Sequence, residues 1–133
     1  MKPEILGLGA GSSAPVMALL DEEFTCHHLW QVAEPDRDQL LRQAAPGVRG
    51  VFTTGTVGIT ARQVAMLPAL EIAVVHGIGV DAVDFAAPRA RGIKVTNTPG
   101  VPTDDVADLA VALLLASAHR LPAMDQYVRS GAW

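Results

Sequence analysis

Short apolar runs alternate along the chain with longer amphipathic segments. Strand-like runs are expected at residues 4–8, 24–30, 48–54, 72–75 and 93–95. Between them apolar residues recur at helical spacing, which predicts helices from Ser12 or Ser13 to residue 20, from Pro35 to Gly47, from a Thr60 cap to residue 67, and around residues 83–91. Five strands separated by helical crossovers predict an α/β fold, a flavodoxin-like, doubly wound sheet of five parallel strands.

The order of these elements also predicts where a ligand would bind. Residues 72–75 form a continuous apolar run, as expected for a central parallel strand that is buried on both faces. Ligands of such sheets bind beyond the carboxyl ends of the strands. The loops at residues 9–13, 53–58, 76–80 and 97–103 are therefore the candidate binding loops.

A different pattern begins at residue 103. Thr103 is expected to cap a long helix over residues 103–120, with Asp104 and Asp105 favourably placed in its first turn. Every position from 109 to 116 is apolar, whereas a surface helix of a complete domain has a polar face. This helix is expected to be covered by another part of the protein or by a second copy.

Composition excludes several classes of protein. The chain has 133 residues, of which 50% are hydrophobic and 18% charged, and this balance argues against disorder. A net charge of −4 argues against nucleic acid as a partner. The single cysteine, Cys26, excludes an internal disulfide, and no targeting or membrane-spanning segment is visible. A cytoplasmic location with no membrane partner is expected.

Two glycine-rich motifs follow expected strands. Gly7 begins a near match to the G-x-G-x-x-G dinucleotide fingerprint, but Ser12 replaces the third glycine and the next strand ends without an acidic residue. A tight turn near a substrate cleft is therefore favoured over nucleotide binding. The second motif starts at Gly77, where Gly77 and Gly79 could expose backbone N–H groups that hold an anion such as a substrate carboxylate. A purely structural turn remains open.

The histidines and nucleophiles suggest no metal site or covalent chemistry. Cys26, His27 and His28 are adjacent, and neighbouring residues on a strand point to opposite faces, so no metal site is expected. His76 ends the central strand beside the second glycine loop, where it either contacts a ligand or fills the strand end. Neither a G-x-S-x-G elbow nor a phosphate-binding P-loop is present.

Four motifs at fixed spacing resemble a known enzyme family. They are G-x-G-x-D-x-V-D from Gly77, R-G-I-x-V from Arg91, N-T-P-G from Asn97 and V-A-D-L-A from Val106. Together they resemble the D-isomer-specific 2-hydroxyacid dehydrogenases, and most closely the glyoxylate/hydroxypyruvate reductase branch. The similarity is strong over residues 75–121, whereas the earlier strands agree only in their order.

The resemblance implies a domain organisation and a set of binding residues. Residues 1–97 would form an incomplete substrate-binding domain, and residues 98–133 the hinge, the interdomain helix and the lead-in to an NAD(P)-binding domain. The backbone of Gly77, Ile78 and Gly79 would hold the carboxylate of a 2-oxo acid, and His76 would line the pocket. Val106 would contact the cofactor.

The same resemblance implies that the chemistry lies outside this chain. The cofactor fingerprint, catalytic arginine, supporting carboxylate and histidine of the family would follow residue 133, so no catalytic residue is expected here. The full enzyme would use NAD or NADP to reduce a small 2-oxo acid, while residues 1–133 alone would bind no cofactor and be inactive. The helix at residues 103–120 would mediate self-association, as a homodimer.

Two other functions remain open at this point. One is a non-catalytic binding or interaction module of the same fold, such as a small-acid sensor or a corepressor-like scaffold. The other is a stand-alone flavodoxin-like domain, which a bound flavin would reveal.

Overall fold

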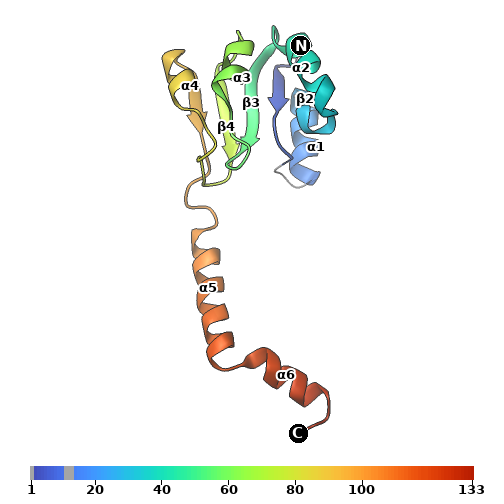
Figure 1. Ribbon diagram of the computed structural model, residues 1–133, viewed down its shortest axis with the longest axis vertical. Coiled ribbons are helices and arrows are strands. Elements are labelled where there is room, and N and C mark those ends of the chain that lie inside the picture. The colour runs from blue at the N-terminus through green and yellow to red at the C-terminus, as the bar shows by residue number, and fades with distance from the viewer. Residues whose placement is uncertain (1, 11–13) are drawn as a thin grey trace. The chain divides into compact units, whose positions relative to one another are not determined.

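The computed structural model describes residues 2–10 and 14–133, and it divides into two units, Met1–Pro99 and Gly100–Trp133. Each unit is described by itself. The elements, labelled in Figure 1, are β1 (Glu4–Gly7), α1 (Ala14–Glu23), β2 (Thr25–His28), a 3₁₀ turn (Leu29–Gln31), α2 (Glu34–Ala44), β3 (Val48–Thr54), α3 (Ala61–Met66), β4 (Ile72–His76), α4 (Ala86–Ala90), β5 (Lys94–Thr96), α5 (Thr103–Ala118) and α6 (Leu121–Arg129).

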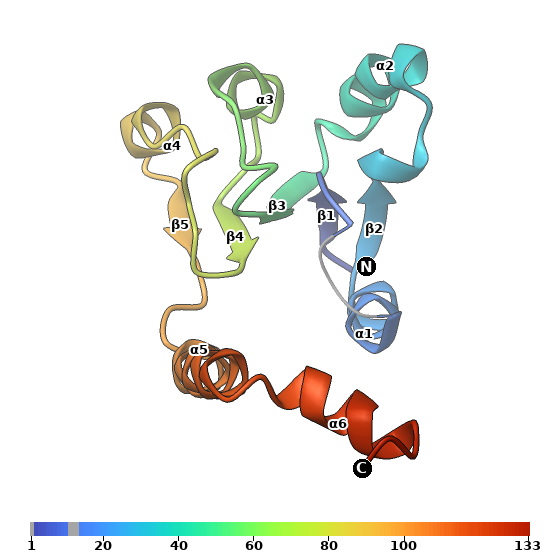
Figure 2. The same ribbon diagram turned by 60° about the horizontal axis from the view of Figure 1, so that its bottom comes forward.

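The first unit is an α/β domain with a five-stranded, all-parallel sheet, which confirms the predicted fold class. The strand order is β2-β1-β3-β4-β5. This is the order of flavodoxin-like sheets, in which the chain winds outward in both directions from β1. Helices α2, α3 and α4 lie on one face of the sheet, and α1 lies on the other (Figure 2).

The two faces of the sheet are covered unequally. The buried core packs α2 and α3 against one face, with Leu6, Val51 and Val75 each 2% exposed or less. Helix α1 contributes no buried residue to the other face. Burial along β4 alternates, with Ala73 and Val75 buried but Ile72 and Val74 only half-buried. The prediction that this strand is buried on both faces is therefore wrong, because α1 lies beside β2 and leaves β4 partly open.

Local signals account for several boundaries. Thr60 caps α3, as predicted, because its hydroxyl accepts from the Gln63 N–H. The Gln63 side chain in turn accepts from the Thr60 N–H, which completes a capping box that was not predicted. Pro35 lies in the first turn of α2, where a missing N–H costs nothing. The predicted caps Ser12 and Ser13 lie outside the described residues.

The second unit consists of two helices. Helix α5 begins at Thr103 with Pro102 at its cap position and no side-chain cap, so the prediction of Thr103 as the capping residue is wrong. The helix ends at Ala118 because Arg120 adopts a left-handed conformation with φ of 53°. Helix α6, which the sequence analysis did not predict, follows directly.

Neither helix of the second unit is long and apolar enough by itself to cross a membrane, and the same holds for every other single helix in residues 2–10 and 14–133. Only α5 and α6 together reach the length and apolar content of a span, and they are bent by 61° at their junction.

Candidate functional site

A hollow of about 510 Å³ lies at the carboxyl ends of β3 and β4, where a parallel sheet of this order binds its ligands. It is formed by the loop after β3 and the loop after β4. The lining residues are Thr54, Gly55, Thr56, His76, Asp81 and Ala82. The structure thus brings two of the four predicted binding loops together in the first unit.

The loop after β4 is held by Asn97 and Thr98, which directly follow β5 and belong to a third predicted binding loop, residues 97–103. The Gly77 N–H donates to the Thr98 hydroxyl at 3.1 Å, and the Thr98 N–H donates to the Gly77 carbonyl at 3.0 Å. The Asn97 side-chain amide donates to the Ile78 carbonyl at 2.9 Å. Gly77 has φ of 131°, which only glycine adopts without strain. These bonds fix the path of the loop.

This geometry changes which backbone groups can bind an anion. Because Thr98 uses both backbone groups of Gly77, the Gly77 N–H is not available to a ligand. In the described part of the chain, the N–H groups of Ile78 and Gly79 donate to no protein acceptor. Two consecutive free N–H groups are suited to holding a carboxylate. Of the three residues predicted to bind through their backbone, two retain that capacity.

The loop after β3 packs directly on the loop after β4. A Cβ placed on Gly55 would lie only 2.8 Å from the Gly79 carbonyl carbon, and closer still to its oxygen. The two loops are also joined by a hydrogen bond from the Ala82 N–H to the Gly55 carbonyl. Thr53, which is fully buried, donates its hydroxyl to the Gly58 carbonyl at 2.6 Å and so holds the far end of the turn. Gly55 is therefore part of the site's framework.

His76 is exposed at the end of β4 and lines the hollow, as the sequence predicted for its position. Its ring lies 6.0 Å from the Phe52 ring, at 37° between planes. The hydroxyls of Thr54 and Thr56, 3.2 Å apart, contribute hydrogen-bonding capacity on the opposite loop. Asp81 places a carboxylate in the same hollow, which opposes an anionic ligand and opposes a doubly charged one more strongly than a singly charged one.

The first glycine motif has a packing role here. A Cβ on Gly7 would collide with the Trp30 ring, and a Cβ on Gly9 would lie 2.9 Å from a methyl carbon of Val57. Both glycines therefore make room for side chains rather than for a pyrophosphate. Gly11, Ser12, which stands at the third glycine position of the motif, and Ser13 lie outside the described residues.

The histidines near β2 are divided between two faces, as expected. His27 pairs with Glu4 at 2.9 Å, whereas Cys26 and His28 face Asp21 of α1. The argument that three adjacent residues cannot share one ion holds. It overlooked that Cys26 and His28, two residues apart, share a face with a carboxylate from a helix.

The second unit exposes much apolar surface. Val106, the predicted cofactor contact, is 61% exposed on α5, and Leu113 and Leu114 are 61% and 68% exposed. Helix α6 lines a largely apolar hollow of about 510 Å³ together with the residues that flank it. The apolar spacing of Leu121, Met124 and Val128 was the signal that could have revealed this helix.

Comparison with known proteins establishes the family. The sequence model described as "D-isomer specific 2-hydroxyacid dehydrogenase, catalytic domain" matches residues 9–129. The chain belongs to the D-isomer-specific 2-hydroxyacid dehydrogenase family. The resemblance inferred from the four motifs is thereby confirmed.

Individual members of this family show how much of a whole protein the chain represents. It is 40% identical over 114 residues to glyoxylate/hydroxypyruvate reductase A of Arabidopsis thaliana, covering 86% of this chain and 36% of that one. The structure of 2-hydroxyacid dehydrogenase from Ketogulonicigenium vulgare Y25 matches with a TM-score of 0.93 at 43% identity, over 99% of this chain and 41% of that one. The chain therefore spans about two fifths or less of these dehydrogenases.

A third dehydrogenase of the family was solved with ligands. NADPH-dependent glyoxylate/hydroxypyruvate reductase from Sinorhizobium meliloti, in complex with NADP and malonate, matches with a TM-score of 0.70 at 33% identity. The match covers all of this chain and 40% of that chain.

Proposed function

We propose that this chain is the substrate-binding part of an NAD(P)-dependent oxidoreductase that reduces a small 2-oxo acid, of the glyoxylate or hydroxypyruvate type, to the D-2-hydroxy acid. The observation that carries the proposal is the pair of free N–H groups at Ile78 and Gly79, held in place by Thr98 and Asn97. The glyoxylate/hydroxypyruvate reductases among the similar proteins support this substrate class.

The residues of this chain would bind and orient the acid. The N–H groups of Ile78 and Gly79 would donate to its carboxylate, which leaves the 2-oxo group to project into the hollow beside His76. The Asp81 carboxylate would favour a substrate with one negative charge over a dicarboxylate. The nicotinamide, when bound, supplies the hydride. We assign proton transfer to none of the residues 1–133. We therefore propose that the chain alone is inactive.

The described residues of the first unit do not fit a complete dinucleotide site. Side chains of Trp30 and Val57 fill the space beside Gly7 and Gly9, where a pyrophosphate would lie. Strand β2 leads into Leu29 and Trp30 rather than into an acidic residue that could hold a ribose. We propose that NAD or NADP is held mainly by the remainder of the whole protein, with Val106 of α5 as a contact from this chain. Residues 1–97 would then be the substrate-binding domain, incomplete by itself, and residues 98–133 the hinge, the interdomain helix and the lead-in to the cofactor domain.

We also propose that residues 103–120 mediate self-association as a homodimer. The exposed leucines of α5 support this, because apolar patches of that kind are commonly interaction sites. Leu113→Glu should convert a concentration-dependent dimer to a monomer in analytical ultracentrifugation, whereas Asp108→Asn should not. A wild-type chain that stays monomeric at high concentration would contradict the proposal.

A cytoplasmic location is proposed because Cys26 carries a free thiol and because the proposed reaction uses a nicotinamide cofactor.

Substrate binding can be tested on this chain directly. Titration with glyoxylate should shift the backbone amide resonances of Ile78 and Gly79 in ¹⁵N–¹H spectra, while that of Gly77 moves less because its N–H is already bonded. Glycolaldehyde, which lacks the carboxylate, is the matched control and should leave all three in place. Shifts that are absent, or that glycolaldehyde reproduces, would refute the carboxylate site.

The enzymatic part requires the whole protein. Residues 1–133 joined to the complementary portion of a glyoxylate/hydroxypyruvate reductase should oxidise NADPH or NADH in the presence of glyoxylate, whereas residues 1–133 alone should not. A folded chimaera that binds glyoxylate without turnover would favour a non-catalytic binding module of the same fold.

A further inference from the structure

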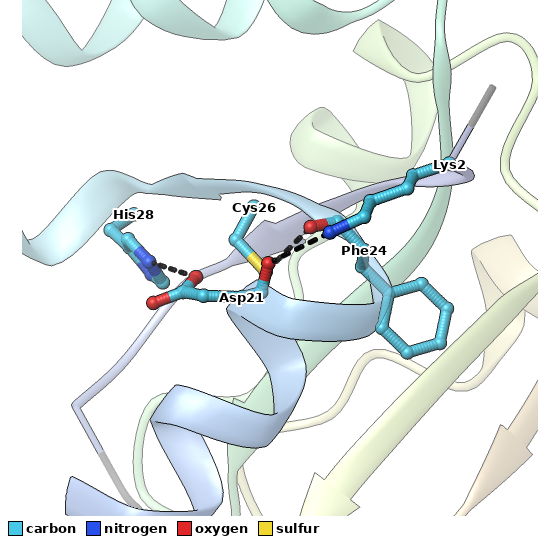
Figure 3. Close-up of polar contacts among 5 residues, drawn as sticks. All are labelled: Lys2, Asp21, Phe24, Cys26 and His28. Carbon is cyan, nitrogen blue, oxygen red and sulfur yellow. Dashed lines mark hydrogen bonds and ion pairs between the residues drawn. The ribbon is translucent and has the colours of Figure 1, made fainter.

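A second cluster of reactive side chains lies apart from the carboxylate-binding hollow, where the end of α1 meets β2. Asp21 comes from the last turn of α1, and Cys26 and His28 come from one face of β2. One ligand atom from each, a carboxylate oxygen, a thiol sulfur and an imidazole nitrogen, lies within 4.8 Å of the other two (Figure 3). The proposed function uses none of the three.

The separation of the imidazole nitrogen and the carboxylate oxygen is close to that of two ligands in a tetrahedral metal site, while the thiol sulfur lies within 4.8 Å of both. His28 Nε2 lies 2.9 Å from Asp21 Oδ1. Zinc bonds of about 2.0–2.2 Å to nitrogen and oxygen at tetrahedral angles place two such ligands about 3.3–3.5 Å apart. The Asp21 side chain is 52% exposed and can move by the few tenths of an ångström that this requires, whereas that of His28 is 17% exposed and rests against Trp30, with ring centroids 4.6 Å apart.

The surroundings differ on the two sides of the cluster. Cys26 and His28 border a tight apolar crevice lined by Ile5, Met17 and Leu20, among others, with no room for water. Such a wall strengthens electrostatic interactions between a cation and its ligands. The exposed Asp21 side leaves an approach for an ion and a position for a solvent ligand. The His28 nitrogen that faces Asp21 is Nε2, whereas the buried Nδ1 has no hydrogen-bond partner among the described residues.

Two features of the cluster oppose a cation. The Lys2 ammonium donates to the Asp21 carbonyl at 3.4 Å and to the Glu22 carbonyl, which places a positive charge beside the three ligands. Burial, together with a hydrogen bond to Asp21, raises the pKa of the Cys26 thiol to about 12. A metal ion must therefore displace the thiol proton, which only an ion with high affinity for sulfur can do near neutral pH.

We propose that Asp21, Cys26 and His28 bind one zinc ion, with solvent in the fourth position. A thiolate, an imidazole and a carboxylate together suit Zn²⁺, which accepts sulfur, nitrogen and oxygen ligands in tetrahedral geometry. On binding, the S–H bond of Cys26 breaks, its proton leaves to solvent and a sulfur–zinc bond forms. The His28 imidazole, which donates from Nε2 to Asp21 in the absence of metal, takes the tautomer protonated at Nδ1, so that the Nε2 lone pair binds zinc; no oxidation state changes. The ion would join the end of α1 to β2.

The test uses the 133-residue chain with Zn²⁺ and Co²⁺ alone. Competition against a zinc-binding dye should show one equivalent of zinc bound, and Co²⁺ should produce a thiolate-to-cobalt charge-transfer band in the near ultraviolet. Cys26→Ala and His28→Gln should each weaken zinc binding about 100-fold or more. The cobalt band should disappear in Cys26→Ala.

The neighbouring residues provide matched controls. His27→Gln changes the adjacent histidine, which pairs with Glu4 on the other face, and should leave zinc affinity unchanged. Lys2→Gln removes the opposing charge and should strengthen binding about threefold to tenfold. Circular dichroism identifies any variant that fails to fold. Such a variant is set aside, and the zinc affinities of the folded variants test the proposal. Binding weaker than millimolar, equal loss in His27→Gln, or a cobalt complex without the thiolate band would overturn the proposal.

Discussion

Gly55 and Gly79 face each other across the two loops of the proposed carboxylate-binding hollow, and the structure predicts opposite responses to the same substitution. A methyl group on Gly55 would lie 2.8 Å from the Gly79 carbonyl carbon, whereas one on Gly79 would meet only Asp81 Oδ2 at 3.4 Å, an ordinary contact. Neither glycine has a positive φ, so the difference is steric. The atom that Gly55→Ala would strike belongs to the backbone and cannot rotate away.

The magnitude follows from these contacts. Forcing a methyl group into a filled space costs about 1–3 kcal/mol. Replacing glycine by alanine where the backbone permits it stabilises the fold by about 0.4–1 kcal/mol, through the unfolded chain. We expect Gly55→Ala to lower the free energy of unfolding by about 1–2 kcal/mol and Gly79→Ala to leave it unchanged or slightly higher. With an m-value of about 1–2 kcal/mol/M, the two urea midpoints should differ by about 1 M.

Urea unfolding followed by the fluorescence of Trp30 measures this difference. Trp30 belongs to the first unit, and Trp133, which is 91% exposed, should be replaced by phenylalanine in both variants so that it does not contribute. Gly55→Ala should also weaken glyoxylate binding, because the displaced backbone carries the Gly79 N–H. Equal midpoints, or a greater loss in Gly79→Ala, would show that the two loops do not pack as described.

Further predictions concern the loop after β4, the end of α3 and the Cys26 thiol. Thr98→Val should weaken glyoxylate binding about 5- to 30-fold in NMR titrations, because the Gly77 N–H loses its acceptor, and Thr98→Ser should retain it. Arg91→Ala should lower the free energy of unfolding in urea by about 1–3 kcal/mol, since this guanidinium donates to the carbonyls that end α3, and a loss below 0.5 kcal/mol would contradict that role. Cys26, with its pKa raised to about 12 mainly by burial, should react with iodoacetamide at pH 8 at least about tenfold more slowly in the native state than in urea. The protonated Cys26 thiol contributes fully to the free energy of unfolding below pH 9, and this contribution is lost as the pH rises toward 12. The free energy of unfolding of Cys26→Ala should therefore fall less than that of the wild type between pH 9 and pH 12.

The sequence predicted the order of the elements well because its signals are local. Pro35 and the Thr60–Gln63 capping box mark helix starts through groups within one turn of each other. Burial was harder to infer from the same pattern. The apolar run in β4 indicates that these side chains avoid water, but not what covers them, and the structure leaves Ile72 and Val74 half-buried. Helix α6 was not predicted, and its second residue, Pro122, is of a type disfavoured inside a helix but tolerated in the first turn, where it lies.

For the site, the sequence located the loop but not its framework. Gly77, Ile78 and Gly79 stand where the prediction placed them, at the end of β4. The acceptor that occupies the Gly77 N–H comes from Thr98, and the backbone that packs on Gly79 comes from Gly55. Likewise, Asp21 joins Cys26 and His28 only because α1 returns beside β2.

The sequence by itself determined the α/β pattern, the glycine loop after β4 and, through four motifs over residues 77–110, membership of a dehydrogenase family. Only the tertiary structure decided that two rather than three backbone N–H groups remain free, that Gly55 is as constrained as a motif glycine, and that a carboxylate, a thiol and an imidazole converge beside α1. The physical reason is distance along the chain. Periodicity and capping act over one or two turns, whereas the register of parallel strands brings together residues about 20 positions apart, as it does for Gly77 and Thr98.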